Sequence, residues 1–351
     1  MKTKFLVTLF FSFASVILLA QDAQTAAPLI NEGIALHEKG KYTEALAKYR
    51  EALLADAGNK TARYEMSYTF MASAQYDSCI EVCESLKKDD PSDDLLRQIY
   101  VTLGSSYDYL KEFEKAIKIY NGGIKKFKDF YLLYFNRGVT YMLSFGEKEK
   151  AEADFQKAVM LKLSHASSHY WLYQINKDDN KIPSVLAASM VCILESQTKR
   201  SAETAEHIVK SMEGNVKKEG NTTNITLFLP SGSGNPKKNE NDFSFVDLGL
   251  SLMAAAPLDD TLKLDTEDKK FSFNYQMLCG LLENSRKYKG FYWRYYAPFF
   301  YELKEAGYTE VVTNLVLQNN NSGDATLWVQ SHSKEIEQFS EWFQNFLWRN
   351  D

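Results

Sequence analysis

The sequence predicts an all-α protein: a stack of helix pairs followed by a second helical region. Two observations carry this prediction. A pattern of small residues, alanines and aromatics recurs about every 34 residues through the first half of the 351-residue chain. In the second half, apolar residues return at helical spacing. The composition, 45% hydrophobic and 25% charged with 17 Gly and 7 Pro, excludes a collagenous or wholly disordered chain.

The chain is mildly acidic. Lys and Arg together number 41 and Asp and Glu 46, which gives a formal net charge of −5. An acidic balance argues against nucleic acid and other polyanions as partners. We therefore expect no nucleic-acid-binding function.

The first twenty residues have the layout of a secretory signal. Two lysines precede a mostly apolar run over residues 5–20, and a polar stretch begins at Gln21. The run is shorter than the ~20 residues that span hydrocarbon, which disfavours the alternative of a retained anchor. We expect cleavage after Ala20, in a pattern that resembles exported proteins of the Bacteroidota. The predicted location is the periplasm or cell envelope, or outside the cell. No later run is long and apolar enough to predict a membrane-spanning helix.

The repeat is defined by small residues at fixed offsets. Gly33, Ser67, Gly104 and Gly138 each precede a second set of core-type residues at +12, +16 and +19, or one residue later in the last unit. This second set is Ala45, Tyr49 and Ala52; Cys79, Cys83 and Leu86; Ala116, Tyr120 and Gly123; Ala151, Phe155 and Ala158. The spacing predicts two helices per unit, over 29–38 and 42–54 in the first. A mid-helix glycine is costly, so its return predicts a close approach of two helices there.

These motifs resemble the tetratricopeptide repeat. The third unit matches best, and the second departs from the pattern with Met66-Ser67 in place of Leu-Gly. Four units cover residues 26–164, and a degenerate fifth and a capping helix over 201–212 follow. The residues that match in the third unit are Tyr100, Leu103, Gly104, Tyr107, Ala116, Tyr120 and Gly123; those of the fifth unit are Trp171, Ala187, Val191 and Leu194. The resemblance implies a helical solenoid that binds protein segments.

The resemblance also implies that the first helix of each unit lines a concave groove. In this chain the residues that line the groove are mainly apolar and aromatic. The cations that would bind a carboxylate of a partner are therefore missing. The occupant is a partner protein segment or the chain's own C-terminal half; the alternative is that these side chains face neighbouring helices. The predicted contact residues are Tyr64, Tyr68, Met71, Phe135, Val139 and Met142, with Glu65, Val101, Thr102, Ser105, Asp108, Tyr109 and Asn136 beside them.

The remaining boundaries follow from composition. Residues 213–242 are rich in Gly, Asn, Ser, Lys and Pro and predict a linker, within which 225–229 allow a short strand. The domains expected are therefore the signal at 1–20, the solenoid at 21–212, the linker, and a helical region at 243–351. Helices are predicted in that region over 242–256, 267–285, 290–306, 309–318 and 325–348.

The segment 291–301, FYWRYYAPFFY, is nearly all aromatic. We favour a buried helix kinked at Pro298, because an exposed patch of this size lowers solubility. The alternative is a platform that stacks on a glycan through Trp293, Tyr295 and Tyr296. The C-terminal stretch resembles the tail of uncharacterised exported repeat proteins of Bacteroidota, a resemblance that implies no activity.

The common catalytic and metal signatures are absent from the sequence. His165 and His169, four residues apart, suit a structural role better than a metal site without a third ligand. Cys79 and Cys83 occupy core positions, so buried thiols are favoured over a disulfide. We therefore expect no enzyme, no cofactor and no metal. The sequence predicts an exported protein-binding scaffold, with a carbohydrate-binding envelope protein as the alternative.

Overall fold

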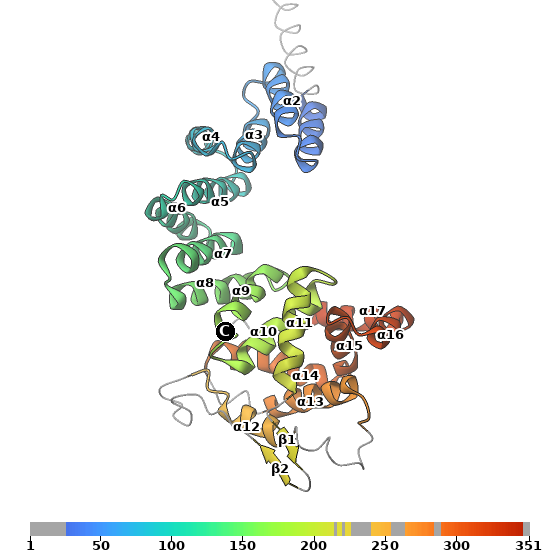
Figure 1. Cartoon of the computed structure of the whole chain (residues 1–351). Helices are drawn as coiled ribbons and strands as arrows, with labels where there is room; N and C mark the ends of the chain where they lie inside the picture. Colours follow the sequence, from blue (N-terminus) through green and yellow to red (C-terminus); the bar gives the residue numbers. More distant parts are fainter. Residues whose placement is uncertain are drawn as a thin grey trace, which may run out of the picture. The chain divides into compact units, whose positions relative to one another are not determined.

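The computed structural model describes residues 26–213, 216–219, 222–225, 240–253, 264–283 and 289–346. The predicted signal at 1–20 and most of the predicted linker lie outside these residues. Two compact units, residues 1–151 and 152–351, divide the chain and are considered separately (Figure 1).

The first unit is a succession of helices in which each packs on the next along the chain (Figure 1). A helix over 26–38 precedes α2, and α8 runs across the unit boundary. The helices are α2 Tyr42–Ala55, α3 Lys60–Ala72, α4 Tyr76–Lys88, α5 Asp93–Tyr109, α6 Phe113–Lys126, α7 Tyr131–Thr140 with the π turn η1 Tyr141–Phe145, and α8 Lys148–Leu161. The predicted helix pairs are confirmed, with the first pair ending within three residues of its predicted bounds.

The turn inside each pair repeats as well. Gly40, Ala74, Lys111 and Gly146 occupy equivalent positions, and all four have left-handed backbones with φ between 60° and 71°. Such a backbone favours glycine. Ala74 and Lys111 are therefore held in this conformation by the packing of the flanking helices. The turn geometry is therefore a property of the repeat.

The mid-helix glycines make room for an aromatic ring. A Cβ atom on Gly33 would lie 2.4 Å from Cε1 of Tyr49, and one on Gly104 would lie 2.4 Å from Cε1 of Tyr120. Both rings are buried. A close approach at these glycines is found, but the group that approaches is the ring sixteen residues downstream rather than a second helix backbone. The spacing of glycine and aromatic is thus one packing contact seen twice.

Gly104→Ala is expected to lower the free energy of unfolding by about 1–2 kcal/mol, because overpacking against the buried Tyr120 ring outweighs the gain in helix propensity. Gly122→Ala is the matched control. Its Cβ would lie 3.5 Å from the Tyr100 ring, an ordinary contact, so a neutral or slightly stabilising effect is expected. Amide hydrogen exchange in α5 and α6 measures both. Equal protection in the two variants would contradict the packing argument.

The second unit is built around α10. Every residue from Ile182 to Cys192 is buried, and the helix contacts α9, α11, α12, η5 and α15. A helix that is apolar on all sides belongs at the centre of a core. The other elements are α9 Ala166–Asn176, α10 Lys181–Leu194, α11 Lys199–Met212, α12 Ser244–Met253, α13 Glu267–Leu281, η5 Tyr292–Tyr296, α14 Ala297–Glu305, α15 Thr309–Asn319, α16 Gly323–Ser331 and α17 Ser333–Asn345.

The boundary between the two units differs from the predicted domain boundary. The helices over 166–212 were expected to end a solenoid at Met212. In the structure, α10 and α11 pack against α13 and α15, and the division falls inside α8. The apolar residues of α10 have their partners in the C-terminal helices, which composition along the chain does not show.

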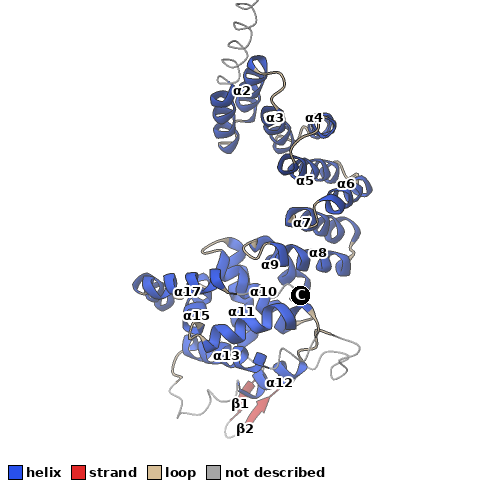
Figure 2. Ribbon diagram, turned by 180° about the vertical axis from the view of Figure 1, so that it is seen from behind, coloured by secondary structure: helices blue, strands red, loops and turns tan. Residues whose placement is uncertain are grey.

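Two local features differ from expectation. The strands are β1 Val216–Glu219 and β2 Thr222–Ile225, an antiparallel hairpin (Figure 2) that shares only Ile225 with the expected strand. The predicted helix over 325–348 is two helices, α16 and α17, separated at His332. The π turn η5 precedes Pro298, which has no N–H to donate to the carbonyl four residues earlier.

Candidate functional site

The predicted contact residues lie on the first helices of consecutive repeats. Tyr64, Tyr68 and Met71 belong to α3, whereas Phe135 and Val139 belong to α7 and Met142 to η1. Tyr68 is 40% exposed and the other five are half-buried. Tyr109 at the end of α5 is 62% exposed and Leu143 in η1 is 67% exposed. We call these eight residues, together with Glu65 and Asp108, the first-helix face.

Aromatic contacts hold the α3 part of this face. The Tyr68 ring stacks on His37 with centroids 5.1 Å apart, and lies 6.4 Å from the parallel Tyr64 ring. The Tyr64 hydroxyl is 3.2 Å from Oγ1 of Thr102 in α5. His37 Nδ1 is 2.7 Å from Oγ1 of Thr69. The half-exposed rings are therefore fixed in place by three successive first helices.

The α5 and α7 parts expose larger apolar areas. The Tyr109 ring stacks on Tyr76 at 5.1 Å between centroids, which fixes its orientation while it stays 62% exposed. Phe113 meets Phe145 edge to face at 6.1 Å. The predicted residues thus lie on α3 and on α7 with η1, and α5 separates these elements in the chain. Whether they bind a partner stays a prediction.

Two carboxylates of the first-helix face are partly removed from water. Desolvation raises the pKa of Glu65, and among the described residues no hydrogen bond or ion pair involves its carboxylate. Desolvation also raises the pKa of Asp108, although the nearby Thr140 hydroxyl opposes the shift. Oδ1 of Asp108 is buried without a hydrogen-bond partner. The sequence analysis placed both residues on this surface but described it as apolar and aromatic, so the charge was missed.

The predicted stacking platform is not present. Trp293, Tyr295 and Tyr296 are 1%, 4% and 0% exposed. The Trp293 ring stacks on Phe243 with centroids 4.0 Å apart, and its Nε1 donates to the carbonyl of Asp242 at 3.1 Å. The segment is a buried helix, as the favoured interpretation had it. The rings are unavailable to a glycan because they form the core of the second unit.

The histidine pair is not arranged as a metal site. His169 is fully buried, with Nδ1 2.6 Å from the Tyr296 hydroxyl and Nε2 2.7 Å from the carbonyl of Leu163. Both ring nitrogens of His169 are therefore used in hydrogen bonds. His165 Nδ1 is 2.8 Å from the Ser168 hydroxyl. Within the described residues, no group of three or more His, Cys, Asp or Glu side chains is suited to hold a metal ion.

The four cysteines are buried free thiols. Cys79 accepts a hydrogen bond from Ser106 at 3.2 Å, and Cys83 donates to Ser67 at 3.4 Å. Burial raises the pKa of Cys192 and of Cys279 to about 12, which suppresses the reactive thiolate.

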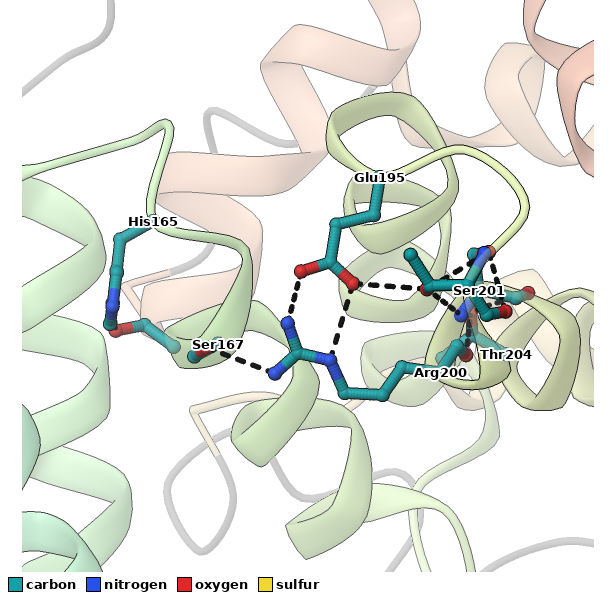
Figure 3. Close-up of polar contacts among 8 residues, drawn as sticks. His165, Ser167, Glu195, Arg200, Ser201 and Thr204 are labelled. Carbon is teal, nitrogen blue, oxygen red and sulfur yellow. Dashed lines mark hydrogen bonds and ion pairs between the residues drawn. The ribbon is translucent and has the colours of Figure 1, made fainter. Parts of the chain in front are cut away.

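A polar cluster next to His165 fastens the loop between α10 and α11. The Arg200 guanidinium binds Glu195 through two nitrogens and donates to the Ser167 hydroxyl at 2.9 Å (Figure 3). Ser201 and Thr198 form a capping box at the start of α11. All of these groups satisfy one another, which indicates a structural role.

The second unit also contains a cavity of about 830 Å³. Helices α13, α15 and α16, together with residues 264, 266, 304 and 307, line it with acidic, basic, amide, hydroxyl and apolar groups, among them Trp328. The sequence does not reveal this cavity, because its walls come from residues spread between 264 and 328.

No described helix is both long enough and apolar enough to span a membrane.

Comparison with known proteins identifies the repeats. One tetratricopeptide-repeat family model matches residues 36–101, and a second matches 98–125 and 131–165. Over 85 residues, 24% of this chain, the sequence is 33% identical to cell division cycle protein 27 homolog A of Arabidopsis thaliana. That match covers 11% of the plant protein, so the chain spans only a small part of this relative.

The solved structures that resemble this chain include two bacterial proteins. A thermophilic tetratricopeptide-repeat protein of Thermus thermophilus is 18% identical, with a TM-score of 0.45, 52% of this chain covered and 99% of the other. PilF of Pseudomonas aeruginosa is 14% identical, with a TM-score of 0.46, 72% of this chain covered and 98% of the other. The family models and the repeated helix pairs agree, and residues 36–125 and 131–165 of this chain are tetratricopeptide repeats.

Proposed function

We propose that the chain is an exported, non-catalytic scaffold whose first-helix face binds a segment of another protein. The observation that carries the proposal is the row of exposed aromatic and apolar side chains on successive first helices: Tyr68 at 40%, Tyr109 at 62% and Leu143 at 67% exposed. Exposed apolar patches are characteristic of interaction surfaces. Tetratricopeptide repeats bind peptides or proteins, which supports this assignment.

The contacts on the face favour recognition of a segment. Tyr68 and Tyr109 are held by stacking on His37 and Tyr76, so little side-chain entropy is lost when a partner covers them. Tyrosines in this setting are common hot spots, because one ring supplies both apolar area and a hydroxyl. The half-buried Met142 adds a side chain that adapts its shape.

Export and the absence of catalysis are parts of the same proposal. The signal-like layout of residues 1–20 supports export to the periplasm or cell envelope. The burial of His169 and of the four thiols supports a structural assignment for the groups that sequence analysis weighed as reactive.

The experiment selects binding peptides from a phage-displayed library of random twelve-residue peptides, with residues 21–351 as bait. Peptides enriched on this protein are expected to bind Tyr68→Ser/Phe135→Ser about tenfold or more weakly, because the apolar contacts are lost. Tyr109→Ser/Leu143→Ser removes only exposed side chains and tests the same surface without risk to the core. Leu54→Ser is the matched control, since Leu54 is 88% exposed on α2.

The readout is the dissociation constant of each synthetic peptide, with circular dichroism to verify folding. Weakened binding in both face variants and unchanged binding in Leu54→Ser would support the proposal. It would be overturned if selected peptides bound the two face variants as tightly as the parent protein.

A further inference from the structure

We infer that the segment bound by the first-helix face carries a Lys or Arg side chain flanked by apolar residues. This inference rests on the proposed function and names the chemistry of its partner. Three features of the described residues support it: two carboxylates without cationic partners, first-helix cations that bind other groups, and exposed tyrosine rings.

Two carboxylates of the first-helix face have no cationic partner. Glu65 in α3 lies one residue after Tyr64, and Asp108 in α5 lies one residue before the exposed Tyr109. Glu65 is half-buried with no partner among the described residues, and Oδ1 of Asp108 is buried and unpaired. A partly desolvated carboxylate without a partner is costly, and a cation that reaches it offsets that cost. A cation bound at this face would therefore stabilise the two carboxylates.

The cations of the first helices do not pair with Glu65 or Asp108. The first helices α3, α5 and α7 contain Lys60, Arg63, Arg97 and Arg137. Lys60 donates to the carbonyls of Asp89 and Asp90, and Arg63 pairs with Asp89 and donates to Ser85 at 2.8 Å. These partners lie at the end of α4, among the second helices.

The two remaining arginines are engaged in the same way. The Arg97 guanidinium lies 5.3 Å from the Phe127 ring and 5.4 Å from the Phe130 ring, beyond the end of α6. Arg137 donates to Asn121 in α6. Arg97 also pairs with Asp94 at 3.6 Å, and the Arg137 guanidinium also lies over the Tyr134 and Tyr141 rings. All four cations thus have partners other than Glu65 and Asp108. Burial lowers the pKa of His37, which keeps this imidazole neutral at pH 7.

The tyrosines complete the recognition chemistry. Tyr68 and Tyr109, on the same helices as the carboxylates, stay partly exposed, and a guanidinium or ammonium over such a ring gains a cation–π contact. The long alkyl stem of Lys or Arg covers apolar surface while the head reaches a carboxylate. Half-buried Met71 and Val139 then accommodate the apolar neighbours of the cationic residue.

The test uses the peptides selected from the same random library. Lys and Arg are expected to be enriched among peptides whose binding depends on Tyr68 and Phe135. Glu65→Gln/Asp108→Asn is expected to weaken these peptides about tenfold or more. Glu81→Gln/Glu114→Gln, which removes two exposed charges from α4 and α6, is the matched control and is expected to change binding less than twofold.

A second arm changes the peptide. Replacing its arginine by citrulline is expected to weaken binding to the parent protein by the same factor as the carboxylate variant, with no further loss when both changes are combined. Additive losses would overturn the pairing, as would selected peptides that lack basic residues; either result leaves the proposed function intact. If no peptide depends on Tyr68 and Phe135, the proposed function itself fails.

Discussion

Replacing Trp293 with alanine is expected to destabilise the second unit by about 3–5 kcal/mol, the range for deleting a fully buried large aromatic side chain. Trp293 is 1% exposed and stacks on Phe243 at 4.0 Å between ring centroids. The substitution leaves a cavity and also removes the donor to the Asp242 carbonyl. Because η5 packs against α10 and α14, the loss extends to the centre of the unit.

Urea unfolding followed by tryptophan fluorescence measures this loss. All five tryptophans lie after residue 151, so the emission reports the second unit, and the variant retains four of them. Phe245→Ala is the control, because Phe245 is an aromatic residue of α12 that is 61% exposed. An effect of Trp293→Ala as small as that of Phe245→Ala would show that the aromatic segment is not core.

The second large effect is a pH dependence that originates from His169. Burial lowers the pKa of His169 from 6.5 to about 4, so the folded state keeps this imidazole neutral. Between pH 6.5 and 4 the unfolded chain takes up a proton that the folded chain does not. The stabilisation from the neutral ring is therefore complete above pH 6.5 and is lost as the pH falls toward 4. The expected loss is about 2–3 kcal/mol.

The measurement compares the parent protein with His169→Gln by urea unfolding from pH 7 to pH 4. Between pH 7 and pH 4 the free energy of unfolding of the parent protein is expected to fall by about 2–3 kcal/mol more than that of the variant. Other groups cancel in this difference, including Asp247, whose pKa burial raises to about 6. Tyr296→Phe is the control, since it removes the hydroxyl partner but keeps the imidazole, and should retain the parent's pH dependence. A constant difference across the range would show that His169 does not titrate this way.

The repeats could be predicted from the sequence because their contacts are local. Gly104 and Tyr120 are sixteen residues apart and touch directly, so one spacing encodes both helices and their packing. The residues of the candidate surface could be predicted for the same reason, since Tyr64, Tyr68 and Met71 are neighbours on one helix. Its charge was harder to predict. Glu65 and Asp108 become significant only once Arg63 and Arg97 are seen to bind elsewhere.

The second unit could be predicted only as a set of helices. Ala188 and Trp293 are both core residues, yet no spacing in the chain relates α10 to η5. The break between α16 and α17 was missed as well. There the His332 ring stacks on Trp328 at 4.2 Å, a local contact that an apolar periodicity does not reveal.

The sequence by itself determined the helix pairs and most residues of the first-helix face, because these depend on contacts within about 40 residues. Only the tertiary structure decided that α10 and α11 share a core with the C-terminal helices, and that Trp328 lines a cavity. The physical reason is that an apolar side chain specifies that it must be covered, whereas its partner depends on which distant helices meet there.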